Sequence, residues 1–183
     1  MAKGSSRFGK YKERKVREAL RNPINVLKSL SEKSQEKSYK YQRLYRNLYN
    51  PEFYLLAYQN IYANKGSMTP GVDGMTIDGI SMARINRIIG SMRNQSYQPK
   101  PARREYIKKK TGNKKRPLAI SSADDKLVQE VVRMILESIY EGSFSVKSHG
   151  FRPNKSCHTA LIQIRKTFTG AKWFVEGDIK ACF

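Results

Sequence analysis

The sequence of 183 residues is poor in cysteine and in acidic residues, and it contains no long apolar run. Its two cysteines, Cys157 and Cys182, form neither a Cys-Xaa-Xaa-Cys pair nor another metal-ligand spacing, so we expect buried free thiols in a reducing compartment. The absence of about 18 consecutive apolar residues excludes a transmembrane helix. The charged segment 1–15 lacks the apolar core of a secretory signal, and we therefore expect none.

The shortage of acidic residues leaves a large positive charge. The chain has 15 Asp and Glu against 36 Lys and Arg, which gives a formal net charge of +21 and an isoelectric point near 10.1. Such a charge repels itself unless a polyanion neutralises it, and contacts with nucleic-acid phosphates also release counterions. An anionic membrane surface and a purely solubilising charge are the alternatives, but no amphipathic membrane anchor is evident. Nucleic acid is therefore the favoured partner.

The positive charge is concentrated in two segments. Residues 1–50 carry 14 basic and 4 acidic side chains, a net charge of +10, and residues 97–120 carry 9 and 1, a net charge of +8. Residues 121–147 reverse the sign, with 3 basic and 5 acidic side chains. A charge that only served solubility would be spread more evenly, so we expect two separate polyanion contacts.

The spacing of apolar residues predicts a mostly helical chain with one hairpin. The segment 1–22 is expected to be disordered or ordered only on binding. A helical stripe of aromatic and leucine residues spans 41–49, and core packing is favoured over base stacking as its role. The other expected elements are helices near 26–30 and over 51–63, 85–94, 122–140 and 156–168, a compact loop over 65–79, hairpin strands over 104–108 and 116–120, and a buried strand over 172–179.

Two features could carry chemistry, and each has a simpler interpretation. Asp178 follows the last expected strand, where a rigid backbone can hold a carboxylate for a metal ion. A strand-terminating Asp at a turn is the alternative, and spacing alone favours it. The basic hairpin tip could fold over a triphosphate, bind nucleic-acid backbone without specificity, or be a solvated turn. Phe183 is by itself compatible with a core aromatic.

Four segments in order resemble the opening conserved blocks of group II intron-encoded reverse transcriptases, also called maturases. They are KGSMTPGVDG (65–74), YQPKPARREYIKKKTGNKKRPLAI (97–120), DDKLVQEVVRMILESIYEGSFSVKSHGFRPNKSCHTAL (124–161) and FVEGDIKACF (174–183). Each block alone is moderately specific, and four in this order are highly specific. The resemblance covers roughly residues 40–183.

The resemblance implies roles for particular residues. Asp178 matches the first catalytic aspartate, a ligand of two Mg²⁺ ions in phosphoryl transfer, and the carbonyl of Ile179 matches a backbone ligand. Lys109 and Arg116 match cations that grip the triphosphate of the incoming nucleotide. Phe183 matches the bulky residue that excludes a ribonucleotide. The residues implied to contact template or intron RNA are Arg103, Arg104, Gly150, Phe151, Arg152 and Pro153.

The sequence departs from the family pattern at three points. Lys108 stands where proline is usual before the nucleotide-binding lysine, and His149 stands where tyrosine is common. The tyrosine-any-aspartate-aspartate box, which supplies the other metal carboxylates, does not occur in the sequence. One carboxylate cannot hold two divalent ions about 4 Å apart. We therefore expect that this chain alone has no polymerase activity and does not retain Mg²⁺.

The predicted fold class is α+β: reverse-transcriptase fingers with a helical N-terminal extension, a basic β-hairpin and a truncated first palm strand. An edge strand without its natural neighbours invites pairing with another chain, which predicts self-association as a homodimer. The expected parts are a basic, partly disordered N-terminal segment over 1–36, a helical extension of the fingers over 37–96, fingers over 97–170 and the start of the palm over 171–183.

Two functions from different classes remain open. The first is an RNA-directed DNA polymerase that copies intron RNA during retrohoming, using RNA template, DNA primer, deoxynucleotides and Mg²⁺ in the complete enzyme. The second is a non-catalytic basic RNA-binding module that holds intron RNA in its splicing-competent fold. A ribosomal-type structural protein fits the charge but leaves the four blocks unexplained. We expect a bacterial cytoplasmic location, associated with nucleic acid and without membrane contact.

Overall fold

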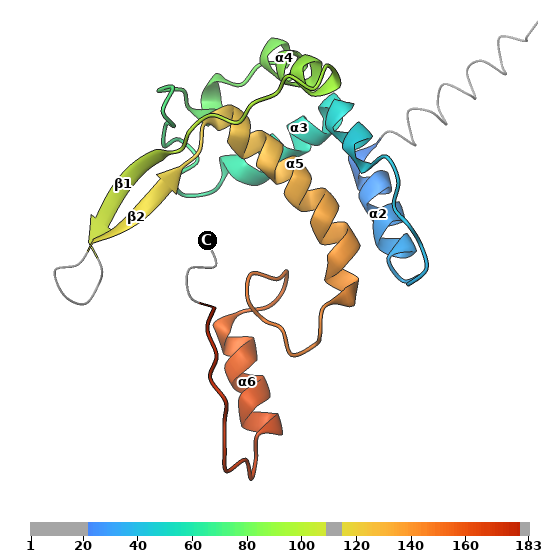
Figure 1. The fold of residues 1–183 in the computed structure, drawn as a ribbon, viewed down its shortest axis with the longest axis vertical. Helices are drawn as coiled ribbons and strands as arrows, with labels where there is room; N and C mark the ends of the chain where they lie inside the picture. Colours follow the sequence, from blue (N-terminus) through green and yellow to red (C-terminus); the bar gives the residue numbers. More distant parts are fainter. Residues whose placement is uncertain (1–21, 109–114, 180–183) are drawn as a thin grey trace, which may run out of the picture. The chain divides into compact units, whose positions relative to one another are not determined.

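The structure, a computed structural model, describes residues 22–108 and 115–179. The chain divides between Gly142 and Ser143 into two compact units, and each is described by itself. The elements of the first unit (Figure 1) are α2 (Pro23–Lys33), η1 (Leu44–Tyr49), α3 (Pro51–Tyr62), η2 (Ile77–Gly79), α4 (Met82–Arg93), β1 (Arg103–Lys108), β2 (Lys115–Ile120) and α5 (Ala123–Tyr140). The short helix η3 (Glu141–Ser143) lies at the junction, and α6 (Cys157–Thr167) belongs to the second unit. The mixed α and β content that the sequence predicts is confirmed.

A polar side chain caps the N-terminus of each α-helix in the described residues. The caps accept a hydrogen bond from a backbone N–H of the first turn, which would otherwise lack an intrahelical partner. In α2 and α3 a proline follows the cap, at the position where a missing N–H loses no bond. The capping residues are Asn22, Asn50, Ser81, Ser122 and Ser156.

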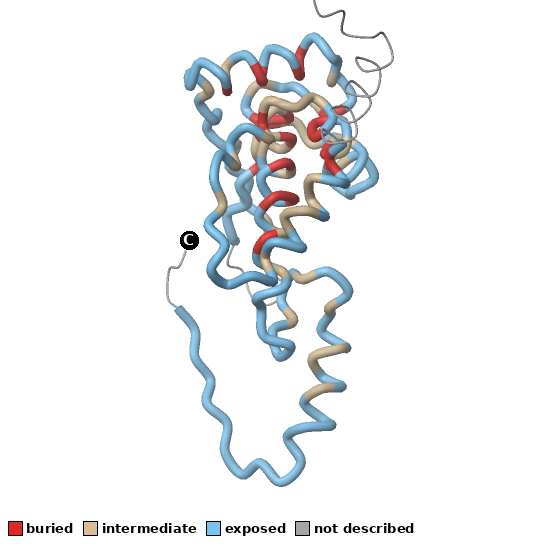
Figure 2. The backbone as a smooth tube through the Cα atoms, turned by 90° about the vertical axis from the view of Figure 1, so that its right-hand side faces the viewer, coloured by how far each residue is buried: buried red, intermediate tan, exposed pale blue. Residues whose placement is uncertain are grey.

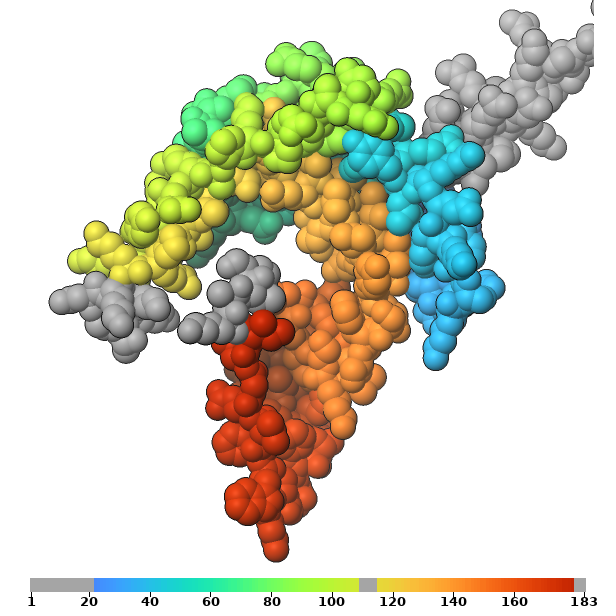
Figure 3. Space-filling model, in the orientation of Figure 1, coloured from blue at the N-terminus to red at the C-terminus, as the bar shows by residue number. Residues whose placement is uncertain are grey.

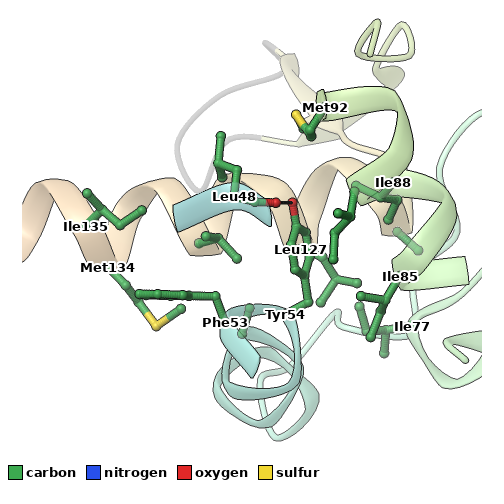
Figure 4. Close-up of a cluster of buried hydrophobic side chains, with 14 of the residues drawn as sticks. Leu48, Phe53, Tyr54, Ile77, Ile85, Ile88, Met92, Leu127, Met134 and Ile135 are labelled. Atoms are coloured by element: carbon green, nitrogen blue, oxygen red, sulfur yellow. Dashed lines mark hydrogen bonds between the residues drawn. The ribbon is translucent and has the colours of Figure 1, made fainter. Parts of the chain in front are cut away.

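The core of the first unit lies among α3, α4, α5 and η1. Phe53, Tyr54 and Leu127 have no exposed surface. In Figure 4 the ring of Phe53 extends toward Met134, and the ring of Tyr54 lies beside Leu127. The hydroxyl of Tyr54 donates a hydrogen bond of 2.9 Å to the carbonyl of Leu48, and burial raises the pKa of this phenol. Figure 2 shows the buried residues of this unit along its helices. The other core residues are Ala57, Ile77, Ile85, Ile88, Ile89, Met92, Ala123, Val131, Met134, Ile135 and Ile139.

The aromatic stripe over 41–49 does not form the continuous helix that its spacing predicts. Arg43 has a φ of 56°, in the left-handed region, and the 3₁₀ helix η1 begins only after it. Because a right-handed helix cannot pass through such a residue, Tyr41 lies outside it. The expected core packing is nevertheless confirmed for Tyr41, Leu44, Leu48 and Tyr49.

The expected strand over 172–179 is wrong. Residues 171–179 have no regular structure and are exposed, with exposed fractions of 90% for Trp173, 83% for Phe174 and 98% for Val175. A strand requires a neighbour for its backbone hydrogen bonds, and no other segment of the described residues pairs with this one. The expected burial of Cys157 is also wrong, because its side chain is exposed at the start of α6, whereas Cys182 lies outside the described residues.

Within the ranges that the structure describes, no helix is both long and apolar enough to span a membrane.

Candidate nucleic-acid interface

The hairpin presents a row of cations on one of its faces. β1 and β2 pair antiparallel, from Arg103 opposite Ile120 to Lys108 opposite Lys115. Paired residues share a face and successive residues alternate. One face, called the basic face below, therefore carries the exposed side chains of Arg104, Tyr106, Lys108 and Lys115. None of its three cations forms an ion pair with any described residue. Figure 3 shows the hairpin, in yellow-green and yellow, projecting from the helices of the first unit.

The loop 65–79 holds the base of the hairpin. A Cβ added to Gly71 would stand 2.6 Å from Cα and 2.9 Å from N of Ser122, the residue that caps α5. Nε of Arg103 donates a hydrogen bond of 3.1 Å to the carbonyl of Pro70. Only glycine allows so close an approach of two backbones, so the loop packs directly on the segment that connects β2 to α5.

Asp125 joins this segment to the chain that enters the hairpin. Its buried carboxylate accepts hydrogen bonds from the hydroxyl of Ser122 at 2.6 Å, from the backbone N–H of Lys100 at 3.1 Å and from the phenol of Tyr97. Burial and the hydrogen bond to Asp125 raise the pKa of Tyr97, so the phenol keeps its proton. The carboxylate thereby fixes the segment that precedes β1.

Two lysines fasten the loop 65–79 further. Nζ of Lys100 lies 2.8 Å from Oδ2 of Asp73, and this hydrogen bond lowers the pKa of Asp73 and raises that of Lys100. Nζ of Lys126, on α5, donates to the carbonyls of Ser67 and Thr69 at 3.3 and 2.8 Å. Burial lowers the pKa of Lys126. These lysines are held by the protein, unlike the cations of the basic face.

A buried arginine lies beside this network. Nε of Arg84, on α4, donates to Oδ1 of Asp124 at 2.6 Å. Arg84 stands four positions before Ile88 and therefore lies on the buried face of α4, but no pattern in the sequence indicates this ion pair. Tyr97, Lys100 and Lys126 are further residues that the sequence analysis did not single out, because their partners lie 25 or more positions away in the chain.

The hairpin register separates the predicted site residues. Arg104 lies on the basic face, whereas Arg103 and Arg116 lie on the opposite face. Arg103 is already engaged, with the carbonyl of Pro70 and with Glu105 at 2.7 Å. Lys109 lies outside the described residues, as does Phe183.

Asp178 and Ile179 lie in the extended segment of the second unit, and both are exposed. In residues 22–108 and 115–179, no group of three or more His, Cys, Asp or Glu side chains gathers as a metal site. These residues by themselves do not fit a pair of Mg²⁺ ions, because each such ion needs several oxygen ligands.

The loop 148–153 exposes an aromatic ring in a constrained backbone. Phe151 is fully exposed and has a φ of 55°, a conformation that bulky residues rarely adopt. Nη1 of Arg152 donates to the carbonyls of Ser145 and Ser148 at 2.7 and 3.0 Å, which holds the loop. Gly150 and Pro153 are exposed. The ring of Phe151 is thus available to a ligand, whereas Arg152 serves the loop itself.

Comparison with known proteins shows what the chain is similar to. Residues 107–183 match the family model for reverse transcriptase (RNA-dependent DNA polymerase). The chain is 54% identical over 165 residues to the group II intron-encoded protein LtrA of Lactococcus lactis subsp. cremoris, a match that covers 90% of this chain and 28% of LtrA.

Two eukaryotic relatives extend this likeness. An uncharacterized 91 kDa protein in the cob intron of Schizosaccharomyces pombe is 46% identical over 168 residues, which cover 89% of this chain and 20% of the relative. The mitochondrial nuclear intron maturase 2 of Arabidopsis thaliana is 54% identical over 55 residues, which cover 30% of this chain and 8% of the relative.

The chain spans about a quarter of the length of LtrA, 28%, and less of the other two relatives. The likeness nevertheless runs through the four segments noted in the sequence, and the predicted resemblance is confirmed. Residues 107–183 thus match the reverse transcriptase family, and over 90% of its length the chain is similar to a group II intron-encoded protein.

Proposed function

We propose that this chain is the N-terminal part of an RNA-directed DNA polymerase that binds intron RNA for splicing and retrohoming. The observation that carries the proposal is the 54% identity to a group II intron-encoded protein across 90% of the chain. The basic face supports it, because Arg104, Lys108 and Lys115 are exposed and without carboxylate partners in the described residues. Cations that the protein leaves unneutralised are suited to phosphates.

The parts of the chain take the roles that the family suggests. Residues 1–36 are a basic segment, 37–96 a helical extension of the fingers, 97–170 the fingers and 171–183 the start of the palm. Arg104 and the loop around Phe151, which includes Gly150, Arg152 and Pro153, contact template or intron RNA. On the opposite face of the hairpin, Arg116 serves the triphosphate of a deoxynucleotide together with Lys109, and Phe183 lies under its sugar.

Asp178 is the first catalytic aspartate of this proposal. In the complete enzyme Mg²⁺, held by Asp178, the carbonyl of Ile179 and carboxylates from elsewhere, supplies charge neutralisation for phosphoryl transfer. The chain by itself is inactive, since it lacks the other carboxylates. The complete protein uses an RNA template and a DNA primer, and it works in the bacterial cytoplasm.

The test of the RNA-binding part is the salt dependence of affinity for intron RNA. Each phosphate contact releases counterions, so log affinity falls linearly with log salt concentration. We expect a steep slope for the 183-residue chain, and a slope near zero would overturn the proposed phosphate contacts. Primer extension by the complete protein tests the polymerase part.

The second candidate function is a non-catalytic RNA-binding module. The full exposure of the segment that bears Asp178 favours it for this chain, since the carboxylate has no described neighbour to share a metal ion. Primer extension separates the two. A complete protein that binds intron RNA but never extends a primer supports the module.

The exposed apolar side chains of Trp173, Phe174 and Val175 also agree with self-association as a homodimer, which light scattering would detect.

A further inference from the structure

The first unit contains a groove between α2 and the segment 39–47. This segment runs back beside α2 (Figure 1), and the hydroxyl of Tyr41 donates a hydrogen bond of 3.1 Å to the carbonyl of Leu30. The groove has a volume of about 410 Å³, within the range of small-ligand sites, and half-buried apolar side chains such as Val26 form its floor. We call it the Tyr39 groove.

The rim of the Tyr39 groove is cationic. Lys33, Arg43 and Arg46 line it, and no Asp or Glu does. None of the three forms an ion pair with another residue in 22–108 or 115–179. Three exposed cations around one hollow repel one another unless an anion joins them. The charge therefore indicates an anionic ligand.

The groove also has an aromatic wall. The rings of Tyr39 and Tyr41 meet edge to face with centroids 5.0 Å apart, and Nζ of Lys33 lies 5.1 Å from the centroid of Tyr39. Tyr39 is partly exposed, at 36%. An exposed ring beside phosphate-binding cations is the arrangement by which proteins hold unstacked bases of single strands. A base can replace the ammonium of Lys33 over this ring, which leaves the lysine for a phosphate.

The backbone at the rim is constrained. Arg43 adopts a φ of 56° and a ψ of 31° although it is neither glycine nor asparagine. Such conformations are unfavourable and are concentrated at ligand sites. At this position the left-handed turn ends the extended segment 39–42 and begins η1, so that Arg43 and Arg46 both line the groove.

A second hollow of about 410 Å³ adjoins the first. The two share Val26, Arg46 and Asn47 in their walls. Its other cation is Arg93, whose guanidinium lies 5.7 Å from the centroid of the Tyr49 ring. Cations and tyrosines therefore line both hollows, and Arg46 belongs to the walls of each.

We propose that the Tyr39 groove binds an unstacked nucleotide of a single-stranded nucleic acid, with its base on Tyr39 and its flanking phosphates on Arg43 and Arg46. This inference rests on the proposed function only in that the partner is nucleic acid. It adds a binding site that is separate from the basic face of the hairpin. A duplex, whose bases remain stacked, has no base to place in this groove.

The test uses the 183-residue chain and fluorescence anisotropy. The probes are a labelled octauridylate, the matching oligodeoxyuridylate and a 12-base-pair RNA duplex. Tyr39→Ala removes the ring, and Tyr39→Phe is its control because it keeps the ring. Arg43→Gln with Arg46→Gln removes two groove cations. Its matched control, Lys37→Gln with Lys40→Gln, removes the same charge from neighbouring positions that do not line the groove.

We expect Tyr39→Ala to weaken single-strand binding roughly 5- to 100-fold, the effect of losing one stacked base, and Tyr39→Phe to bind like the wild type. Tyr39→Ala and the wild type should bind the duplex with equal affinity. The arginine pair should weaken octamer binding more than its lysine control. Comparison of the RNA and DNA octamers shows which sugar the groove accepts. The proposal is supported if Tyr39→Ala lowers the affinity for either octamer.

The proposal is overturned if Tyr39→Ala binds both octamers as the wild type does. If Arg104→Gln with Lys108→Gln then still weakens RNA binding, only the groove is wrong and the proposed function stands. If the wild-type chain binds neither the probes nor intron RNA, the proposed function itself is contradicted. Circular dichroism of each variant identifies a loss of fold, which is not expected at these exposed positions.

Discussion

Gly71 lies directly against the backbone of Ser122, where an added Cβ would stand 2.6 Å from Cα of Ser122. Through this contact the TPGVDG motif packs against the residue that caps α5, in the segment that follows β2. This motif, part of one of the four segments that carry the family resemblance, thus also supports the basic hairpin. The side chains of Lys100 and Lys126 bind the same loop, through Asp73 and through the carbonyl of Thr69.

Replacement of Gly71 by alanine should destabilise the first unit. The new methyl group has to displace backbone, which costs about 1–3 kcal/mol. Gly90→Ala is the control, because no atom lies within 4 Å of its added Cβ and alanine favours the helix α4 by roughly 0.5–1 kcal/mol. Urea unfolding measures both variants. Equal midpoints for the two would refute the close contact.

The ion pair of Asp73 and Lys100 should make stability depend on pH in acid. The hydrogen bond from Lys100 lowers the pKa of Asp73 below its unfolded value of about 3.9. The contribution of this ion pair to the free energy of unfolding is therefore fully present above about pH 4, and it is lost as the pH falls through the lower folded pKa. The urea midpoints of the wild type and Asp73→Asn should differ constantly between about pH 5 and 7 and converge below about pH 3. A constant difference at all these pH values would contradict the prediction.

The two faces of the hairpin should respond differently to loss of a cation. Arg104→Gln removes a phosphate contact from the basic face, so the slope of log affinity against log salt for intron RNA should fall by about 1. Arg116→Gln, on the opposite face, removes the same charge and should leave that slope unchanged. In the complete protein it should instead raise the KM for deoxynucleotides. An equal loss of slope in both variants would show that the faces are not distinct.

Replacement of Phe151 by glycine should have opposite effects on stability and on nucleic-acid affinity. Its left-handed backbone favours glycine, so Phe151→Gly should preserve or increase stability, by up to about 1 kcal/mol. The exposed ring is lost at the same time, and primer-template affinity of the complete protein should fall. Thermal unfolding and a binding titration measure the two effects. A destabilised variant would mean that the ring is packed rather than available.

Much of the first unit could be predicted from local sequence. The helices α3, α4 and α5 begin at polar caps and repeat apolar residues at helical spacing, and both signals are contained within a few positions. The hairpin strands could be predicted for the same reason, because a Thr-Gly-Asn sequence flanked by lysines stands between two strand-like runs.

The remaining features depend on distant partners. Tyr97 and Asp125, or Lys126 and Thr69, are joined only by the fold, and periodicity carries no information about such pairs. The apolar run before Asp178 predicts a buried strand, but a strand also needs a pairing partner, and none is present among the described residues. The left-handed conformation of Arg43 cannot be predicted from spacing either, since Tyr41 and Leu44 pack against the core on either side of it.

The catalytic assignment is tested most directly by primer extension on an RNA template by the complete protein, with Asp178→Asn compared with Glu176→Gln. Both variants remove one exposed carboxylate from the same segment, so their charge and local structure are matched. Loss of a metal ligand removes several kcal/mol of transition-state stabilisation, and Asp178→Asn should extend primers on the order of 1000-fold more slowly. Glu176→Gln should retain wild-type activity. Full activity in Asp178→Asn would contradict the assignment.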